Sequence, residues 1–202
     1  MMQTRKWIRA TPSTAQRTVC ALGLSLMLAC GAVQAIEVAG TQVAEQQTLE
    51  GQTLQLNGAG LRSKFFIKVY VGALYASQKS NSAQTLIDSP TPRRMRLHIL
   101  RELEADSFYS ALDEGMRNNL SPAQLGALKP KIDQLGNLMR ALGKVRQGDV
   151  IDLDFSSAGV ALLRNNENAG KVAGADFAAA LLKVWLGEQP ADAALKKALL
   201  GN

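Results

Sequence analysis

The feature that most constrains the fold is the run from Phe65 to Tyr75, in which both alternating sets of side chains are largely apolar. Successive side chains of a strand point to opposite sides of a sheet, so this run predicts a central strand covered on both faces. Asn57-Gly58 precedes it and predicts a tight turn, because both residues tolerate positive φ. Arg62 follows this turn and is either exposed or directed into a pocket, where a buried guanidinium requires an anion or several acceptors.

The first 35 residues have the features of a secretory signal peptide. A basic segment precedes an apolar run, Val19 to Ala29, that is too short to span a membrane. Val33-Gln34-Ala35 then offers a cleavage site after Ala35. We therefore expect a single domain over residues 36–202, without a membrane span, in the periplasm or secreted. Met27-Leu28-Ala29-Cys30 offers an alternative, a lipoprotein anchored at Cys30.

The net charge does not indicate a nucleic-acid partner. The chain has 23 basic and 17 acidic residues, and four of the basic residues lie in the leader with no acidic residue beside them. The remaining domain is therefore close to neutral, whereas nucleic-acid binding requires a concentrated basic patch. Both cysteines also lie in the leader, and a single histidine, His98, cannot form a metal site alone. No metal or other cofactor is predicted.

The remaining pattern predicts an α+β fold. Apolar residues recur at spacings of three and four in the segments 104–118, 122–142 and 175–186, which predicts helices, and shorter helices are expected at 80–88 and 192–200. Alternating segments at 94–99, 151–155 and 160–164 predict further strands. Local hairpins with segregated helices favour an antiparallel sheet over a parallel α/β arrangement.

Charged residues occupy one set of alternating positions on two of these strands. Arg94, Arg96 and His98 share one strand face, and Asp152 and Asp154 share another. We expect both sets to face solvent. The chain also lacks a complete dinucleotide-binding glycine motif, a phosphate-binding loop and a nucleophile elbow.

The segment Asn57-Gly-Ala-Gly-Leu-Arg62, the aromatic strand to Tyr75, the helix around Tyr109 and the segment Phe177 to Gly187 resemble the chalcone isomerase-like superfamily, especially its short secreted bacterial members. The resemblance covers residues 36 to 200. It implies an open-faced β-sandwich, in which a large antiparallel sheet packs against a layer of helices with a ligand cleft between them.

The resemblance also implies site residues. The arginine and the tyrosine of the isomerase site match Arg62 and Tyr109, and a strand threonine falls near Tyr70. Two polar substrate-binding positions, an asparagine and a threonine or serine, are replaced by Met116 and Val184. We expect these five residues to line the ligand site, with Arg62 and Tyr109 as the catalytic pair if the protein is an isomerase.

The two replacements favour binding over catalysis. Hydroxyl groups of a flavonoid would lose their partners at Met116 and Val184, whereas a fatty acid needs an apolar wall and a cationic site for its carboxylate. The sequence therefore favours a non-catalytic binder of a fatty acid or a similar amphiphilic carboxylate. Two alternatives are an isomerase, or intramolecular lyase, acting on an enone-type substrate, and an envelope interaction module without a small ligand.

Overall fold

The computed structural model describes residues 34–202. The basic segment, the apolar run and both cysteines of the predicted leader lie outside these residues. The described part contains no helix that is long and apolar enough to cross a membrane.

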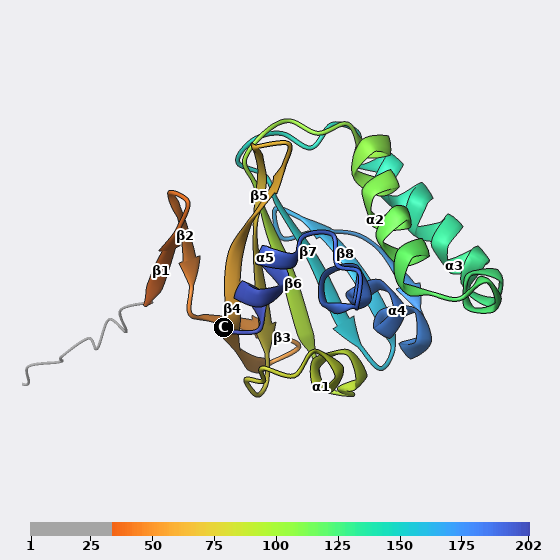
Figure 1. Cartoon of the computed structure of the whole chain (residues 1–202), viewed down its shortest axis with the longest axis horizontal. Helices are drawn as coiled ribbons and strands as arrows, with labels where there is room; N and C mark the ends of the chain where they lie inside the picture. The colour runs from red at the N-terminus through yellow and green to blue at the C-terminus, as the bar shows by residue number, and fades with distance from the viewer. Residues whose placement is uncertain (1–33) are drawn as a thin grey trace, which may run out of the picture. The chain divides into compact units, whose positions relative to one another are not determined.

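Seven strands form one antiparallel sheet in which every strand pairs with its neighbours in the sequence, from β3 to β9 (Figure 1). The strands are β3 Gln46–Leu49, β4 Gln52–Lys64, β5 Ile67–Ala76, β6 Arg93–Ile99, β7 Val150–Ser156, β8 Gly159–Arg164 and β9 Glu167–Ala173. A separate hairpin precedes them and consists of β1 Ala35–Val38 and β2 Thr41–Ala44. The α+β class and the large antiparallel sheet expected from the sequence are confirmed.

The helices gather on one side of the sheet and against one another. They are α1 Ala83–Asp88, α2 Ala105–Asn119, α3 Pro122–Ala141, α4 Ala175–Leu186 and α5 Ala193–Leu199. Figure 1 shows α2 and α3 side by side, and α2 also packs against α4, while α5 lies on β4. Ser121 caps α3 through a capping box with Gln124, and Pro122 lies at the helix start.

Two apolar clusters cover the two faces of β5. The larger one fills the space between sheet and helices and includes Tyr70, Leu74 and Trp185. The smaller one, on the opposite face, includes Val71 and Tyr75. The prediction of a central strand covered on both faces is therefore correct.

The predicted turn at Asn57-Gly58 is wrong, because β4 continues through both residues and turns only at Phe65-Phe66. The Asn57 side chain is buried, donates to the carbonyl groups of Ser80 and Leu199, and accepts from the Ser80 amide. A Cβ at Gly58 would lie 2.1 Å from the Ala198 carbonyl oxygen. The pair therefore allows α5 to approach the strand closely instead of reversing the chain.

The charges expected to face solvent are largely covered, which is a second correction: Arg94, Asp152 and Asp154 are buried, and Arg96 and His98 are half-buried. Arg94 forms a bidentate pair with Asp154, and Arg96 forms one with Asp152, whose exposed fraction is 0%. Gln47 of β3 also lies within 3.4 Å of Arg94. The alternating pattern shows that these residues share one face of the sheet. It does not show that the arginines and aspartates of neighbouring strands pair with one another, which allows the charges to be buried.

The strand β9 is not predicted by the sequence reading. Its residues, Glu167 to Ala173, include three small ones, Ala169, Gly170 and Ala173, and only one buried side chain, Val172. An edge strand with one partner needs no alternating apolar pattern, so the hydrophobic period carries little signal there.

Candidate functional site

Arg62 lies on β4 directly opposite Tyr70 of β5. Its guanidinium carbon is 5.4 Å from the centre of the Tyr70 ring, a distance typical of a cation–π contact. The side chain is half-buried, and its Nε atom is buried without a hydrogen-bond partner among the described residues. Because an unpaired buried donor of a charged group is costly, this arginine is suited to receiving an anion.

Tyr70 supports Arg62 from within the core. The tyrosine is 2% exposed, and its hydroxyl accepts a hydrogen bond of 2.9 Å from Nε1 of Trp185 on α4. Burial raises the pKa of Tyr70, although the positive charge of Arg62 and the Trp185 hydrogen bond oppose this shift. The phenol therefore stays neutral at physiological pH and retains its own proton to donate.

A mainly apolar pocket of about 200 Å³ lies beside Arg62, between the end of the β4–β5 hairpin and α2. We call it the Arg62 pocket, and it is lined by Arg62, Lys64, Phe65, Ile67, Val69, Arg101, Leu103, Ser107, Phe108 and Ala111. A second pocket, of about 180 Å³, also contacts Arg62 but has a more polar wall that includes Glu114 and Asn118. Arg62 thus separates an apolar compartment from a polar one.

Tyr109 is located on another face of α2. Its ring packs against Gly136 and lies 5.4 Å from the guanidinium carbon of Arg140, and both of these residues belong to α3. Tyr109 is not among the residues that line either pocket at Arg62. The structure therefore brings Arg62 together with Tyr70 and places Tyr109 between two helices.

Met116 and Val184 lie in the larger apolar cluster. Met116 is 0% exposed and Val184 is 1% exposed, and a Cβ at Gly115 would lie 2.7 Å from a methyl group of Val184. Neither residue lines the Arg62 pocket or its polar neighbour. At these positions, where the resemblance implies polar contacts to a substrate, the chain has packed core instead.

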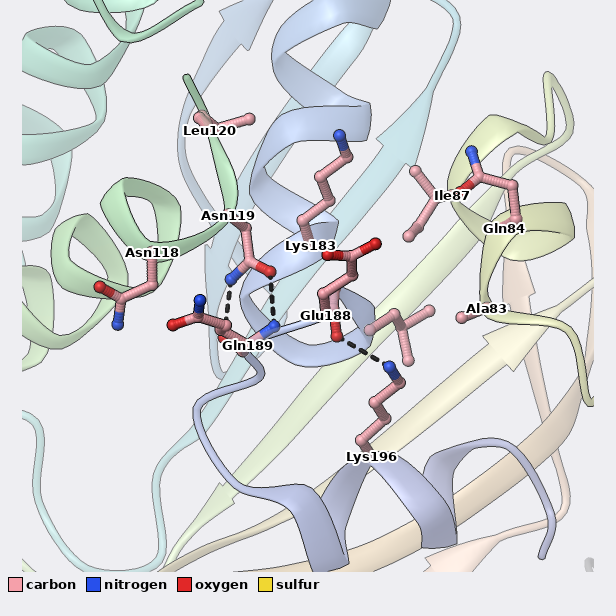
Figure 2. A pocket seen from close by; sticks show the side chains of 12 residues that line it. Ala83, Gln84, Ile87, Asn118, Asn119, Leu120, Lys183, Glu188, Gln189 and Lys196 are labelled. Atoms are coloured by element: carbon pink, nitrogen blue, oxygen red, sulfur yellow. Dashed lines mark hydrogen bonds between the residues drawn. The ribbon is translucent and has the colours of Figure 1, made fainter. Parts of the chain in front are cut away.

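A larger hollow, of about 510 Å³, lies between α1, the end of α2 and the α4–α5 connection (Figure 2). Figure 2 shows that several of its polar groups are already bonded within the chain. Asn119 donates to the Gln189 carbonyl and accepts from the Gln189 amide, and Lys196 donates to the carbonyl of Gly187. These bonds hold the connection between two helices, so this hollow is less suited to an anionic ligand than the Arg62 pocket.

No group of three or more His, Cys, Asp or Glu side chains within residues 34–202 is arranged to hold a metal ion.

The sequence reading missed several residues of this pocket. Phe108 and Ser107 precede Tyr109 on α2 and face the Arg62 pocket in its place, and Arg101 lies in the segment between β6 and α2. Helical periodicity shows that Phe108 and Leu112 share the core-facing stripe, which could have placed Phe108 nearer to the sheet than Tyr109.

Comparisons with known proteins agree with this fold. A fatty-acid binding protein from Arabidopsis thaliana has a similar structure, with a TM-score of 0.66 and 16% sequence identity over 83% of this chain and 96% of that one. Comparison with curated proteins gives no match. A profile of the family described as chalcone isomerase-like matches residues 35–201. With nearly all of its described residues matched by this profile and its sheet and helices arranged as in that neighbour, the chain belongs to the chalcone isomerase-like family.

Proposed function

We propose that the protein binds a fatty acid or a similar amphiphilic carboxylate without catalysing a reaction, with the carboxylate at Arg62. The observation that carries this proposal is the buried Nε of Arg62, which lacks a partner among the described residues at the edge of a mainly apolar pocket. A carboxylate there would accept charge-assisted hydrogen bonds from the guanidinium, and the Arg62 pocket would hold the adjoining methylene groups.

The size of the pocket limits what it can enclose. A volume of about 200 Å³ is smaller than that of pockets that enclose a whole drug-sized ligand. We expect a short-chain or medium-chain acid to fit largely inside. A long chain would extend past Phe65 and Ile67, which form the outer part of the pocket wall.

Titration calorimetry with decanoate and palmitate tests the proposal. Arg62→Met removes the charge but keeps an apolar stem, and we expect it to weaken binding by at least about 2 kcal/mol, as for the loss of a desolvated charge pair. Arg140→Met is a matched control, because Arg140 lies at the same 5.4 Å from a tyrosine ring but does not line the Arg62 pocket. Equal binding by the Arg62→Met variant and the unaltered protein would refute the proposal.

The buried Met116 and Val184 argue against chalcone cyclisation, since no polar group at these positions could pair with a flavonoid hydroxyl. We therefore expect cyclisation no faster than the spontaneous reaction. Turnover well above that rate, and lost in the Arg62→Ala variant, would instead support an isomerase.

We also propose that the protein is exported and cleaved after Ala35. The basic segment, the short apolar run and Val33-Gln34-Ala35 support this proposal. Intact-mass measurement of protein recovered from the periplasm should give an N-terminus at Ile36. A diacylated species that begins at Cys30 would establish the lipoprotein alternative.

A further inference from the structure

The tip of the β4–β5 hairpin exposes three large apolar residues. Phe65 is 82% exposed, Phe66 is 104% exposed and Ile67 is 49% exposed. We call these three residues the aromatic tip. In Figure 1 the tip lies where β5 begins, at the top of the view, and the pocket lining places it near the segment that joins β6 to α2. Exposed aromatic residues in succession are unusual unless they contact a partner.

The tip places two bulky residues at positive φ, whereas each of the other such hairpins has at most one residue there that is neither Gly nor Asn. Phe65 and Phe66 form a two-residue loop between the paired residues Lys64 and Ile67, with φ values of 50° and 66°. Positive φ at both positions favours Asn and Gly and disfavours bulky side chains. Three other two-residue loops in the described chain have positive φ at both positions, and they read Ala39-Gly40, Glu50-Gly51 and Asn165-Asn166.

Unpaired cations surround the tip. Lys64, Lys68 and Arg101 are exposed, and we call these three residues the basic collar. Within residues 34–202 none of them forms a salt bridge, whereas the nearby Glu102 and Glu104 are both paired with Lys144. The Lys64 ammonium lies 5.9 Å from the centre of the Phe65 ring. Aromatic side chains next to cations match the boundary between the acyl chains and the anionic headgroups of a phospholipid bilayer.

The shape of the tip favours a bilayer over a protein partner. A stable protein interface buries about 800 Å² on each side, which requires a broad complementary surface. A two-residue loop that projects its side chains offers a narrow convex point, which a bilayer can accommodate. Phe65 and Ile67 also line the Arg62 pocket, so insertion of the tip would place the mouth of this pocket at the membrane surface.

We propose that the aromatic tip and the basic collar dock the protein on an anionic phospholipid surface, and that the Arg62 pocket exchanges its ligand there. The docking stands on the tip and the collar alone. Only the exchange of ligand rests on the fatty-acid binding proposed above. The strain at Phe65 and Phe66 is then the cost of presenting two aromatic rings where a hairpin would otherwise carry Asn and Gly.

Flotation with vesicles tests the docking on protein recovered from the compartment in which it accumulates, with its N-terminus checked by mass. The unaltered protein should float with vesicles of phosphatidylethanolamine and phosphatidylglycerol, more weakly with phosphatidylcholine alone, and more weakly in high salt. The double variant Phe65→Asn/Phe66→Gly should lose at least about tenfold in vesicle affinity. Its melting temperature should rise, because Asn-Gly suits this turn.

A loss of vesicle affinity together with a rise in melting temperature would show that the double variant loses docking without damage to the fold. Glu50→Asn is the matched control, because it relieves positive φ in another hairpin, and it should leave vesicle binding unchanged. If the double variant binds vesicles as tightly as the unaltered protein, the docking proposal is wrong. If the unaltered protein instead self-associates in analytical ultracentrifugation and the double variant does not, the tip is a contact between copies of the chain.

A single variant distinguishes docking from ligand binding. Phe66 does not line the Arg62 pocket, so Phe66→Gly should bind decanoate from solution with unchanged affinity but take it up more slowly from vesicles. If the unaltered protein floats with vesicles but binds no decanoate, the docking stands and the proposed function fails. Equal uptake from vesicles by Phe66→Gly and the unaltered protein would refute the proposed exchange at the membrane.

Discussion

Arg62 and Arg140 each lie beside a tyrosine ring, but Arg62 lines an apolar pocket and Arg140 does not line that pocket. Arg62 and Arg140 are each 5.4 Å from the ring of their tyrosine. Tyr70 is buried and bonded to Trp185, whereas Tyr109 is half-buried between α2 and α3. A sequence motif can therefore identify residue types that suit a binding site. Packing decides which of the two arginine–tyrosine contacts lies at the pocket.

Substitution of the two tyrosines should separate their roles. Tyr70→Phe leaves Nε1 of Trp185 without its acceptor, and we expect a loss of about 1–3 kcal/mol in the free energy of unfolding. Tyr109→Phe should change it by less than about 0.5 kcal/mol, because the Tyr109 hydroxyl forms no hydrogen bond with any residue from 34 to 202. Urea denaturation measures both values. Equal losses in the two variants would contradict this assignment.

The buried ion pairs allow a second prediction at the same scale. Asp154→Ala leaves the buried Arg94 without its bidentate partner and should cost about 3–5 kcal/mol in the free energy of unfolding. Asp133→Ala removes an exposed pair with Lys129 and should cost about 0.5 kcal/mol or less. A loss at Asp154 as small as that at Asp133 would show that water reaches Arg94.

At the scale of elements, α5 fixes the strand that carries Arg62. Glycines at positions 58 and 60 allow the close approach, since a Cβ at Gly60 would lie 2.6 Å from the Ala198 side chain. Asn57 then bonds to the Leu199 carbonyl at 2.7 Å. The position of Arg62 thus depends on a helix more than a hundred residues away in the sequence.

Alanine substitution of two glycines should have opposite effects. Gly58→Ala places a Cβ against the backbone of α5 and should lower stability by about 1–3 kcal/mol and increase hydrogen exchange in α5. Gly126→Ala, in an open position within α3, should raise stability by up to about 1 kcal/mol. If Gly58→Ala leaves exchange in α5 unchanged, the close packing of helix on strand is not what holds α5.

The helices were the easiest elements to predict, because their apolar stripes span several turns and their capping residues are local. The predicted segment 175–186 matches α4 at both ends, and Gly187 caps the C-terminus of that helix. The turn at Phe65-Phe66 could not be predicted, since neither residue favours positive φ, and Asn57-Gly58 is occupied by contacts with distant segments. For the site, Arg62 and Tyr70 are brought together, whereas Tyr109 faces α3. The apolar stripe that Phe108 and Leu112 share on α2 is the local pattern that could have indicated this.

At the scale of the whole molecule, all three tyrosines are held in their neutral form. Burial raises the pKa of Tyr75 to about 12, and burial also raises the pKa of Tyr70 and of Tyr109. Each phenol has an ordinary pKa of about 10 in the unfolded chain. The unfolded state therefore loses these protons at lower pH than the folded state does.

This difference predicts alkaline unfolding. The stability contributed by the neutral Tyr75 phenol is fully present below about pH 10 and is lost as the pH rises through about 12. Tyrosinate absorbance and circular dichroism should therefore change together, and Tyr75→Phe should reduce the loss of stability per pH unit. Tyrosinate formation centred near pH 10 with an unchanged circular dichroism spectrum would contradict this prediction.

The contact between Asn57 and Leu199 has a consequence for the order of assembly. Each strand from β3 to β9 pairs with its neighbours in the sequence, so the sheet can grow step by step as the chain becomes available. The hydrogen bond from Asn57 spans 142 residues and can form only after α5 has been made. The strand that presents Arg62 is thus among the first parts of the sheet to be synthesised and among the last to be locked in place.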